Sequence, residues 1–219
     1  MRTIAFATQK GGSGKSTLAI GIAVVAMQDG ERVAILETDP QGTASNWGLR
    51  RGKPEPAIIP VTYGFELERS LRKLADEDYT LAIIDTPAGA GNSLQAAAIR
   101  AADLCLLPAR PSVADVEASH PTIRTLQRFG KPFAFVLNQT GARYRSDNAE
   151  ALGRLGVLAL PCIVLRNDHQ HALAAGLGVS EYDPNGKAAG EVRELWVWVK
   201  QKLETGSGDD VQPRLAAAE

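Results

Sequence analysis

Cysteines are scarce in this 219-residue sequence, and it contains no long apolar run. The two cysteines, Cys105 and Cys162, are too few for a disulfide-rich secreted scaffold, and both lie in apolar stretches typical of strands. We therefore expect both to be buried free thiols without a chemical role. The longest apolar runs, such as Ala19–Met27, fall well short of the roughly 20 residues that a membrane-spanning helix requires. The sequence thus predicts no membrane span.

A secretory signal and an excess of one charge are also missing. Met1 and Arg2 lead directly into a strand-like run, without the charged, apolar and small-residue regions of a signal peptide, so we expect a cytoplasmic protein. The formal net charge of −1 neither requires nor excludes a nucleic-acid partner, because a local basic face can exist on a neutral protein. Between Arg143 and Lys202 there are 8 Lys or Arg residues against 7 Asp or Glu, so no basic stripe stands out.

The sequence does contain a regular alternation of short apolar runs with longer helical patterns. The runs that we interpret as strands are Ile4–Ala7, Val33–Leu36, Ile58–Val61, Leu81–Ile84, Leu104–Leu107, Phe133–Leu137 and Leu158–Leu165. Because these runs are apolar throughout, helices should cover both faces of the sheet. The pattern predicts an α/β fold with a doubly wound, mostly parallel sheet.

Helices are expected between these strands, each with a breaker or capping residue near one end. They are Lys15–Gln28, Phe65–Ala75, Leu94–Ala101, Val113–Phe129 with a break at Pro121, Asp147–Leu155, His169–Ala175 and Ala188–Lys202. We interpret residues 1–203 as a single domain. Residues 204–219 have too little apolar content to join a core, so we expect a disordered tail there.

A glycine-rich segment stands between the first expected strand and the first helix: Gln9-Lys10-Gly11-Gly12-Ser13-Gly14-Lys15-Ser16-Thr17. Its glycines allow backbone N–H groups to turn toward an anion, and the helix N-terminus adds its positive end. Lys15 would then lie near the β- and γ-phosphates, and the Ser16 hydroxyl would bind Mg²⁺. The segment is predicted to bind ATP, although the plain phosphate-loop pattern requires glycine where this sequence has Gln9.

The run from Lys10 to Ser16 resembles the deviant phosphate loop of the ParA/MinD ATPase family, and the resemblance extends over roughly residues 2–203. The resemblance implies catalytic roles for two lysines of the loop, Lys10 and Lys15. Lys10 corresponds to the family's signature lysine, which crosses a dimer interface to the partner's phosphates. An ATP-bound homodimer is therefore implied, with ATP and Mg²⁺ as cofactors.

Two acidic segments extend the resemblance. The segment Glu37-Thr38-Asp39-Pro40-Gln41 is similar to the family's D-x-D-P-Q motif, which implies that Asp39 organises the attacking water and that Glu37 replaces a first aspartate. Asp39 as the cap of a surface turn is the alternative. Asp85 follows an apolar strand at its carboxyl end, where open α/β sheets bind ligands, and it would hold Mg²⁺ through a coordinated water.

Two later positions complete the predicted site. Asn138 ends another strand with an amide that can donate to and accept from the adenine edge, as in the resembled family, while a plain turn residue is the alternative. Residues 160–167 resemble a family segment near DNA-contacting basic residues. That resemblance implies a DNA contact for Arg166, with scattered solvated charge as the alternative.

The resemblance to small ParA proteins without an N-terminal DNA-binding extension implies an ATPase with weak basal activity. Its ATP-bound dimer would bind DNA non-specifically on the nucleoid and be released when a ParB-like or equivalent cargo adaptor stimulates hydrolysis. The cargo would be a plasmid, a chromosome region or a large protein assembly.

Two other functions are alternatives to this one. A MinD-like membrane-cycling protein would need a basic and apolar C-terminal helix, whereas residues 194–202 are interpreted as a docked terminal helix. A metabolic ligase or an iron–sulfur reductase component is the other alternative, and the reductase would require exposed cluster-binding cysteines.

Overall fold

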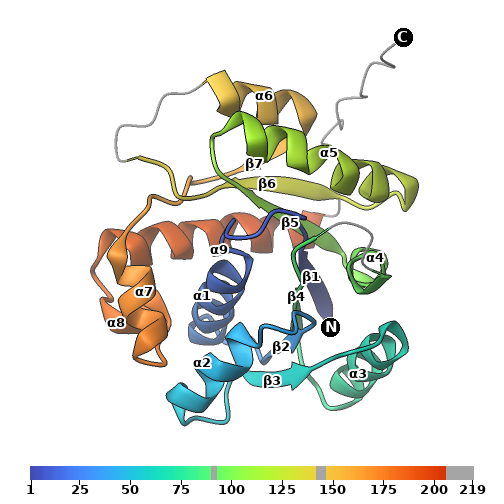
Figure 1. Ribbon diagram of the computed structural model, residues 1–219. Coiled ribbons are helices and arrows are strands. Elements are labelled where there is room, and N and C mark those ends of the chain that lie inside the picture. Colours follow the sequence, from blue (N-terminus) through green and yellow to red (C-terminus); the bar gives the residue numbers. More distant parts are fainter. Residues whose placement is uncertain (90–92, 142–146, 206–219) are drawn as a thin grey trace.

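The computed structural model describes residues 1–89, 93–141 and 147–205, and these residues form one seven-stranded sheet. The strands lie in the order β3-β2-β4-β1-β5-β6-β7, and all neighbours run parallel (Figure 1). Their bounds are β1 (Arg2–Phe6), β2 (Val33–Glu37), β3 (Ala57–Pro60), β4 (Leu81–Asp85), β5 (Leu104–Ala109), β6 (Phe133–Leu137) and β7 (Val157–Ala159). The predicted doubly wound parallel sheet is confirmed.

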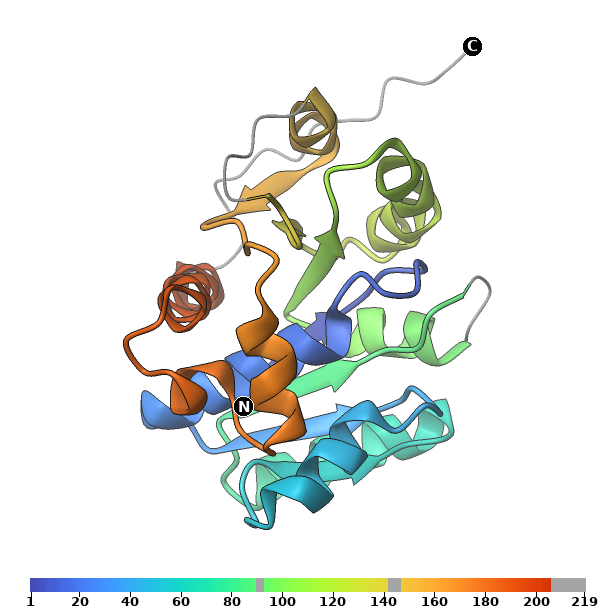
Figure 2. The ribbon, with the colours of Figure 1, turned by 60° about the vertical axis from the view of Figure 1, so that its left-hand side comes forward.

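Helices cover both faces of this sheet (Figure 2). On one face lie α1 (Lys15–Gln28), α2 (Thr43–Arg51), α7 (Asn167–Ala174), α8 (Val179–Tyr182) and α9 (Lys187–Thr205). On the other face lie α3 (Gly64–Asp76), α4 (Ser93–Ala101), α5 (Val113–Arg128) and α6 (Asp147–Leu155). Successive strand residues point to opposite faces, so each strand supplies both cores. In β1, for example, Ile4 and Phe6 enter the first core while Ala5 enters the second.

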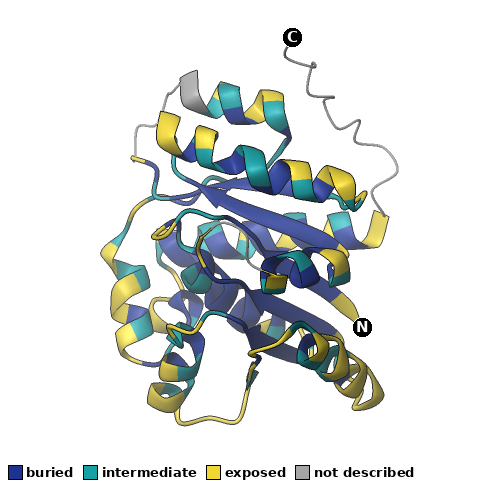
Figure 3. Cartoon of the chain, turned by 45° about the vertical axis from the view of Figure 1, so that its right-hand side comes forward, coloured by how far each residue is buried: buried dark blue, intermediate teal, exposed yellow. Residues whose placement is uncertain are grey.

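Helix α1 is enclosed between the sheet and α9, and most of its side chains are apolar and buried. Figure 3 shows that the central strands are buried as well. A β-carbon added at Gly21 would be in ordinary van der Waals contact with Val192 of α9, at 3.4 Å. A β-carbon at Gly178 would lie only 2.6 Å from Val24, so the chain before α8 needs glycine to pack this closely on α1. The helix that begins at the phosphate loop is thereby fixed inside the molecule.

Two helices were not predicted from the sequence. Helix α2 begins after Gly42, which has no side chain to cap it. The cap comes from Glu37 at the end of β2, whose carboxylate oxygens accept from the N–H groups of Ala44 (2.5 Å) and Ser45 (3.1 Å). Helix α8 is a single turn of four residues. Helix α8 is too short for a periodicity pattern to reveal, and the residue before each helix, Gly42 or Gly178, is not one of the capping side chains that mark a helix start.

The strand predicted at 158–165 is wrong beyond Ala159. Pro161 has no N–H group to donate, so the strand ladder cannot continue through it. The chain returns to the edge of β6 at Ile163, whose N–H donates to the Leu137 carbonyl at 2.8 Å, and Val164 then forms an isolated pairing with Thr140. Cys162 therefore lies outside a strand and is only half-buried, whereas Cys105 is buried within β5; both are free thiols.

The predicted break at Pro121 is also wrong, because α5 runs unbroken from Val113 to Arg128. An interior proline costs a helix about 3 kcal/mol through the lost hydrogen bond and steric conflict. Buried side chains lie on both sides of it, Ser119 before and Ile123 and Leu126 after. Burial of the apolar side chains favours one continuous helix over two separate segments.

The last helix extends to Thr205, two residues beyond the predicted end of the domain, and the rest of the predicted tail, 206–219, lies outside the described residues. Its apolar side packs against α1 and the sheet. Asp29, at the end of α1, accepts from the indole N–H of Trp196 at 3.0 Å and from the ammonium of Lys200 at 2.6 Å. The predicted docked helix is confirmed. Among the described helices, none combines the length and apolarity needed to cross a membrane.

Candidate nucleotide-binding site

The glycine-rich loop joins β1 to α1 at the carboxyl edge of the sheet, where the sequence predicted it. Gly12 and Gly14 have φ of +71° and +95°, a backbone region that favours glycine. Gly14 also has no room for a side chain, because a β-carbon there would lie 2.2 Å from the amide nitrogen of Asn138. Gln9 lies at the base of the loop, where its carbonyl accepts from the N–H of Gly89 at 2.8 Å.

Lys15 is the first residue of α1 and is only 7% exposed. Its ammonium donates to the carbonyl of Lys10 at 3.5 Å. Burial lowers the pKa of Lys15, and the nearby carboxylates of Asp85 and Asp39 oppose that shift. The phosphate loop thus holds a largely buried cation whose closest polar contact is a loop carbonyl.

Lys10 has a different environment from Lys15, although both belong to the same loop. Its ammonium forms an ion pair with Asp115 in α5, and its side chain is 24% exposed. The Asp115 carboxylate also accepts from the hydroxyl of Ser112 and from the N–H of Arg110 at 3.1 Å. Burial alone would raise the pKa of Asp115, but these hydrogen bonds and the Arg110 guanidinium hold it below its ordinary value.

Asp85 ends β4 and is completely buried beside the loop. Neither of its carboxylate oxygens makes a well-formed hydrogen bond with the described residues. Burial raises the pKa of Asp85 to about 7; the Ser16 hydroxyl and Lys15 oppose this shift, while Asp39 and Glu37 add to it. A buried carboxylate without a partner is costly in a folded protein, and beside a hydroxyl it offers the oxygen ligands that Mg²⁺ prefers.

The carboxylates of Glu37 and Asp39 make different contacts in the structure. Glu37 is buried and caps α2, which a shorter aspartate at this position would reach less easily. Asp39 is half-buried, and its carboxylate accepts from the N–H of Gln41 at 2.9 Å, so the turn contact considered in the sequence analysis is present. Asp39 also acts electrostatically on Lys15 and Asp85. Its assignment to the attacking water stays a prediction.

A cavity of 360 Å³ opens beside Asp39. Its lining residues come from the ends of β2 and β3 and the starts of α2 and α4: Glu37, Thr38, Asp39, Pro40, Gly42, Ser45, Pro60, Val61, Thr62 and Leu94. Thr38 holds the ends of β2 and β4 together, since its N–H and its hydroxyl both donate to the carbonyl of Asp85 at 2.9 Å. Asp39, which lines this cavity, is close enough to Lys15 and Asp85 to act on both electrostatically.

A second hollow, of 80 Å³, lies on the opposite side of the loop. It is lined by Gly14, Thr17, Leu18, Asn138, Gln139, Val164, Leu165, Arg166, His169, Gln170 and Leu173. The amide nitrogen of Asn138 donates to the Ser13 carbonyl at 2.7 Å, and that of Gln139 donates to the Gly12 carbonyl at 3.0 Å. Asn138 is thus placed beside the loop as expected, and its contact with a base stays a prediction.

Arg166 lines the same hollow and precedes the first turn of α7. Its guanidinium forms an ion pair with Glu191 of α9 at 2.6 Å, and the two side chains are 24% and 15% exposed. The other carboxylate oxygen of Glu191 accepts from the N–H of Val164 at 3.1 Å. The structure therefore places Arg166 in a largely buried, neutralised pair and not on an open basic surface, which gives the predicted DNA contact no support.

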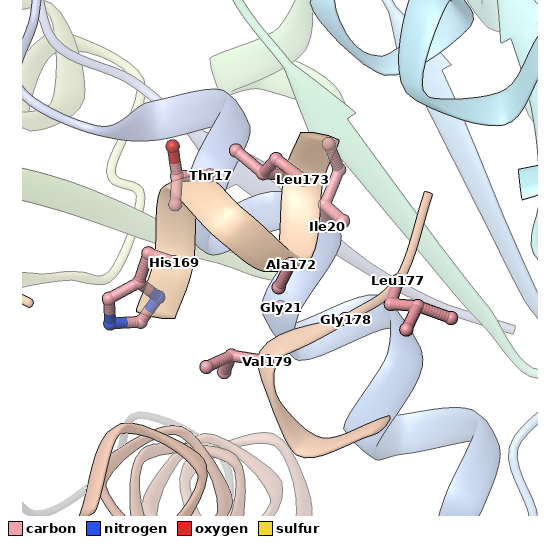
Figure 4. A pocket seen from close by; sticks show the side chains of 9 residues that line it. All are labelled: Thr17, Ile20, Gly21, His169, Ala172, Leu173, Leu177, Gly178 and Val179. Atoms are coloured by element: carbon pink, nitrogen blue, oxygen red, sulfur yellow. The ribbon is translucent and has the colours of Figure 1, made fainter. Parts of the chain in front are cut away.

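Helix α7 lies beside α1, the helix that follows the phosphate loop, with a small cavity of 10 Å³ between them. Figure 4 shows Thr17, Ile20 and Gly21 of α1 on one side of this cavity. His169 lies at its edge, and burial lowers the pKa of this imidazole. On its other side α7 is held by α2, because the Arg50 guanidinium donates to the Leu173 carbonyl at 3.1 Å.

Several residues of this site were missed by sequence reasoning. Gln139 and His169 border the second hollow, Thr38 joins two strand ends, and Asp115 binds Lys10 from 105 residues away. Gln139 follows Asn138 directly, so its position alone would have nominated it. Nothing in the local sequence connects Asp115 with Lys10, because the contact exists only after α5 packs beside the loop.

Comparisons with known proteins agree with a nucleotide-binding site at this position. The family model described as the CobQ/CobB/MinD/ParA nucleotide-binding domain matches residues 4–186. The maintenance of carboxysome distribution protein A of Halothiobacillus neapolitanus is 30% identical over 203 residues, covering 88% of this chain and 94% of that protein. The chromosome-partitioning ATPase Soj of Thermus thermophilus is 29% identical over 155 residues, covering 58% of this chain and 62% of Soj.

Among solved structures, an ATP complex of a McdA variant from Cyanothece has a TM-score of 0.72 at 20% identity, covering 93% of this chain and 96% of that one. This likeness supports the fold, which is that of a P-loop nucleotide-binding protein.

Proposed function

The chain belongs to the CobQ/CobB/MinD/ParA nucleotide-binding domain family, and we propose that it is an ATPase that positions a cargo through cycles of ATP-dependent dimerisation. The observation that carries this proposal is the arrangement at the carboxyl edge of the sheet. Glycines in the left-handed backbone region, a buried lysine and a buried carboxylate that makes no well-formed hydrogen bond with the described residues lie close together there. This combination suits a triphosphate with its Mg²⁺.

The residues take the following roles in the proposal. Residues 11–17 bind the phosphates through loop N–H groups, with Lys15 as the cation for the β- and γ-phosphates. Ser16 and Asp85 hold Mg²⁺, which would neutralise charge on the phosphate oxygens when bound. Asp39 orients the attacking water. Asn138 contacts the adenine edge from the second hollow, which lies where the base of a nucleotide seated on the loop would reach.

Dimerisation supplies the remaining catalytic group. Lys10 crosses to the partner's phosphates in the ATP-bound dimer and stabilises the charge that develops during phosphoryl transfer, as an arginine finger does in other NTPases. Basal hydrolysis is slow, and a cargo adaptor of ParB type or its equivalent accelerates it. Loss of the γ-phosphate then removes the link between the two protomers.

The cargo we favour is a large protein assembly. The similarity to a carboxysome-distribution protein extends over nearly that protein's whole length, whereas the similarity to the chromosome-partitioning Soj covers less of both chains. The ATP-bound dimer binds DNA non-specifically, so that the nucleoid serves as the surface on which cargo is distributed. The residues that contact DNA lie elsewhere than Arg166.

Asp39→Ala provides the direct test. The variant should bind ATP and form a long-lived dimer without turnover, because Asp39 acts on the water and not on the phosphates. Light scattering after size-exclusion chromatography, with ATP, with ADP and without nucleotide, reports the dimer, and phosphate release reports turnover. Asp183→Ala, which removes an exposed carboxylate from the turn after α8, is the control and should behave as the wild type.

A variant that stays monomeric with ATP would contradict the dimer cycle. Co-sedimentation of the trapped dimer with DNA, and separately with anionic lipid vesicles, then distinguishes a nucleoid-binding protein from a MinD-like membrane-binding one. The burial of the apolar side of α9 against α1 favours the first outcome.

A further inference from the structure

The second half of α5 carries positive charge that no acidic side chain neutralises. Arg124 and Arg128 are exposed and stand four residues apart, so they lie on the same face of the helix. Neither forms an ion pair or a hydrogen bond with another residue that the structure describes. Like charges at this spacing repel one another and slightly destabilise a helix. A bound anion would relieve that repulsion.

Arg100 adds a third positive charge from the neighbouring helix. It is exposed in the last turn of α4, and its guanidinium lies 5.4 Å from the ring centroid of Phe129, the residue that follows Arg128. Figure 1 shows α4 and the end of α5 on the same side of the molecule. Arg100, Arg124 and Arg128 therefore form one exposed basic patch.

This patch differs from other exposed basic side chains, which face acidic ones. The Arg154 guanidinium lies 3.9 Å from the Glu150 carboxylate, and the Lys200 ammonium lies 2.6 Å from that of Asp29. Around the patch such acids are missing from the sequence. Residues 118–141 include three Lys or Arg residues and no Asp or Glu.

The helix dipole accounts for only part of the patch. Basic side chains in the last turn of a helix interact favourably with its negative end, and Arg100 and Arg128 occupy such positions. Arg124 precedes the last turn of α5, so the dipole gives no reason for its charge. Three positive charges that gather without acids favour an external polyanion as the partner.

The position of the patch keeps it accessible when the nucleotide site is covered. The first turn of α5 borders the phosphate loop, because Asp115 is paired there with Lys10. The exposed acid Glu117 also belongs to this first half of the helix. The basic patch lies at the opposite end of α5, so a second protomer at the loop would leave it free.

The chemistry of the patch favours duplex DNA over a membrane or a single strand. None of the exposed large apolar residues of the described chain lies on α4 or on the second half of α5, whereas binding to a membrane surface requires apolar side chains beside the basic ones. The ring of Phe129 is half-buried beneath Arg100, so it is not free to stack on an unpaired base. Phosphate contacts remain, and these carry no sequence information.

We propose that Arg100, Arg124 and Arg128 are the residues through which this protein binds the phosphate backbone of duplex DNA without regard to sequence. The inference rests on the proposed function, because dimerisation with ATP doubles the contacts from three to six. Two linked patches on one duplex bind far more tightly than one, which makes binding depend on ATP. At about 0.9 per contact, the slope of log affinity against log salt should be about 2.7 for a protomer and about 5.4 for the dimer.

The test measures affinity for a fluorescent duplex of arbitrary sequence over a salt series, with ATP, in an Asp39→Ala background that does not deplete the dimer. The double variant Arg124→Gln/Arg128→Gln removes four contacts per dimer, so its slope should be lower by about 3.6. Arg69→Gln/Arg72→Gln is the matched control. It removes two exposed arginines from α3, a helix with acidic residues of its own, and should keep the parent's slope.

A second readout separates DNA binding from the nucleotide site. In an otherwise wild-type protein, Arg124→Gln/Arg128→Gln should release phosphate from ATP at the wild-type rate when no DNA is present, because neither residue lies at the phosphate loop. A second duplex of unrelated sequence should give the same slopes for every variant, since phosphate contacts do not depend on the bases.

The failures are distinguishable. Equal slopes for the parent and Arg124→Gln/Arg128→Gln overturn the role of the patch, as does a dimer that binds anionic vesicles but not DNA. A parent protein that stays monomeric at saturating ATP overturns the dimer cycle and leaves the patch open to test. The monomer's slope of about 2.7 should then fall to about 0.9 in the double variant, and an unchanged slope would overturn the patch as well.

Discussion

The two sides of the phosphate loop are built in different ways. On the phosphate side, Lys15 and Ser16 belong to one continuous motif, and Asp85 comes from the strand next to β1. On the other side, the second hollow combines the loop with the end of β6 and the start of α7, which both lie more than a hundred residues after the loop. The first side therefore comes from short motifs that directly follow strands, and the second depends on how distant segments pack.

The two sides also differ in how their charges are balanced. On the phosphate side, the buried Asp85 carboxylate and the Lys15 ammonium have few polar contacts within the protein. Beside the second hollow, the Arg166 guanidinium is neutralised by Glu191, and the amide nitrogens of Asn138 and Gln139 donate to loop carbonyls, although Arg166 Nε and His169 Nε2 make no hydrogen bond with the described residues. The buried Asp85 carboxylate is the unpaired acidic group of the two sides, which makes the phosphate side the better candidate for a metal and a charged ligand.

Lys15→Ala should have the largest effect and should confirm that the phosphate side carries most of the affinity. Removing a buried cation from its phosphate contact costs about 2 to 5 kcal/mol, so ATP affinity should fall roughly 30-fold or more. Titration with a fluorescent ATP analogue measures the change, and Lys53→Ala, at an exposed lysine, serves as the matched control. Comparable affinity in Lys15→Ala and wild type would remove Lys15 from the site.

The raised pKa of Asp85 predicts a smaller effect that depends on pH. The carboxylate must be ionised to hold Mg²⁺, and in the free protein its pKa is about 7. Below pH 7 a proton must leave before the metal binds, so Mg²⁺-dependent ATP affinity should fall by up to about tenfold for each pH unit and should level off above pH 7. Titrations between pH 5.5 and 8.5, with and without Mg²⁺, provide the measurement.

The same shift has a consequence for the stability of the nucleotide-free protein. A carboxyl whose pKa is 3.8 when unfolded and about 7 when folded binds more protons in the folded state. Its contribution to the free energy of unfolding is therefore complete below pH 3.8 and is lost as pH rises through 7. Asp85→Asn should remove this pH dependence, and an unchanged profile in that variant would contradict the assignment.

The contrast between the two sides also explains what the sequence could predict. The phosphate loop, Asp39 and Asp85 were identified because their motifs follow strand ends directly, and the parallel sheet followed from the apolar runs. The sequence did not reveal α2, since its capping carboxylate comes from Glu37 on a strand. It also suggested a break at Pro121 that burial on both sides of the proline prevents.

Arg166 is the residue whose sequence-based prediction differs most from its surroundings in the structure. The sequence placed it in a segment that resembles a DNA-contacting region, whereas the structure pairs it with Glu191 beside the second hollow. A motif predicts which residue is present, but the partner that neutralises its charge lies 25 residues further along the chain, on another helix. Exposure and pairing therefore decide whether an arginine is available to a phosphate backbone.

Arg166→Gln should have the smallest effect on nucleic-acid binding and a clear effect on stability. Each DNA phosphate contact contributes about 0.9 to the slope of log affinity against log salt, so a dimer with two contacting arginines would lose about 1.8 in the variant. Because Arg166 is paired and largely buried, we expect equal salt slopes for the wild type and the variant with ATP present.

Arg166→Gln and Glu191→Gln should each lower the free energy of unfolding by roughly 1 kcal/mol. The double variant should lose less than the sum of the two, because both changes remove the same ion pair. A flattened salt slope together with additive stability losses would instead return Arg166 to the DNA-contacting surface.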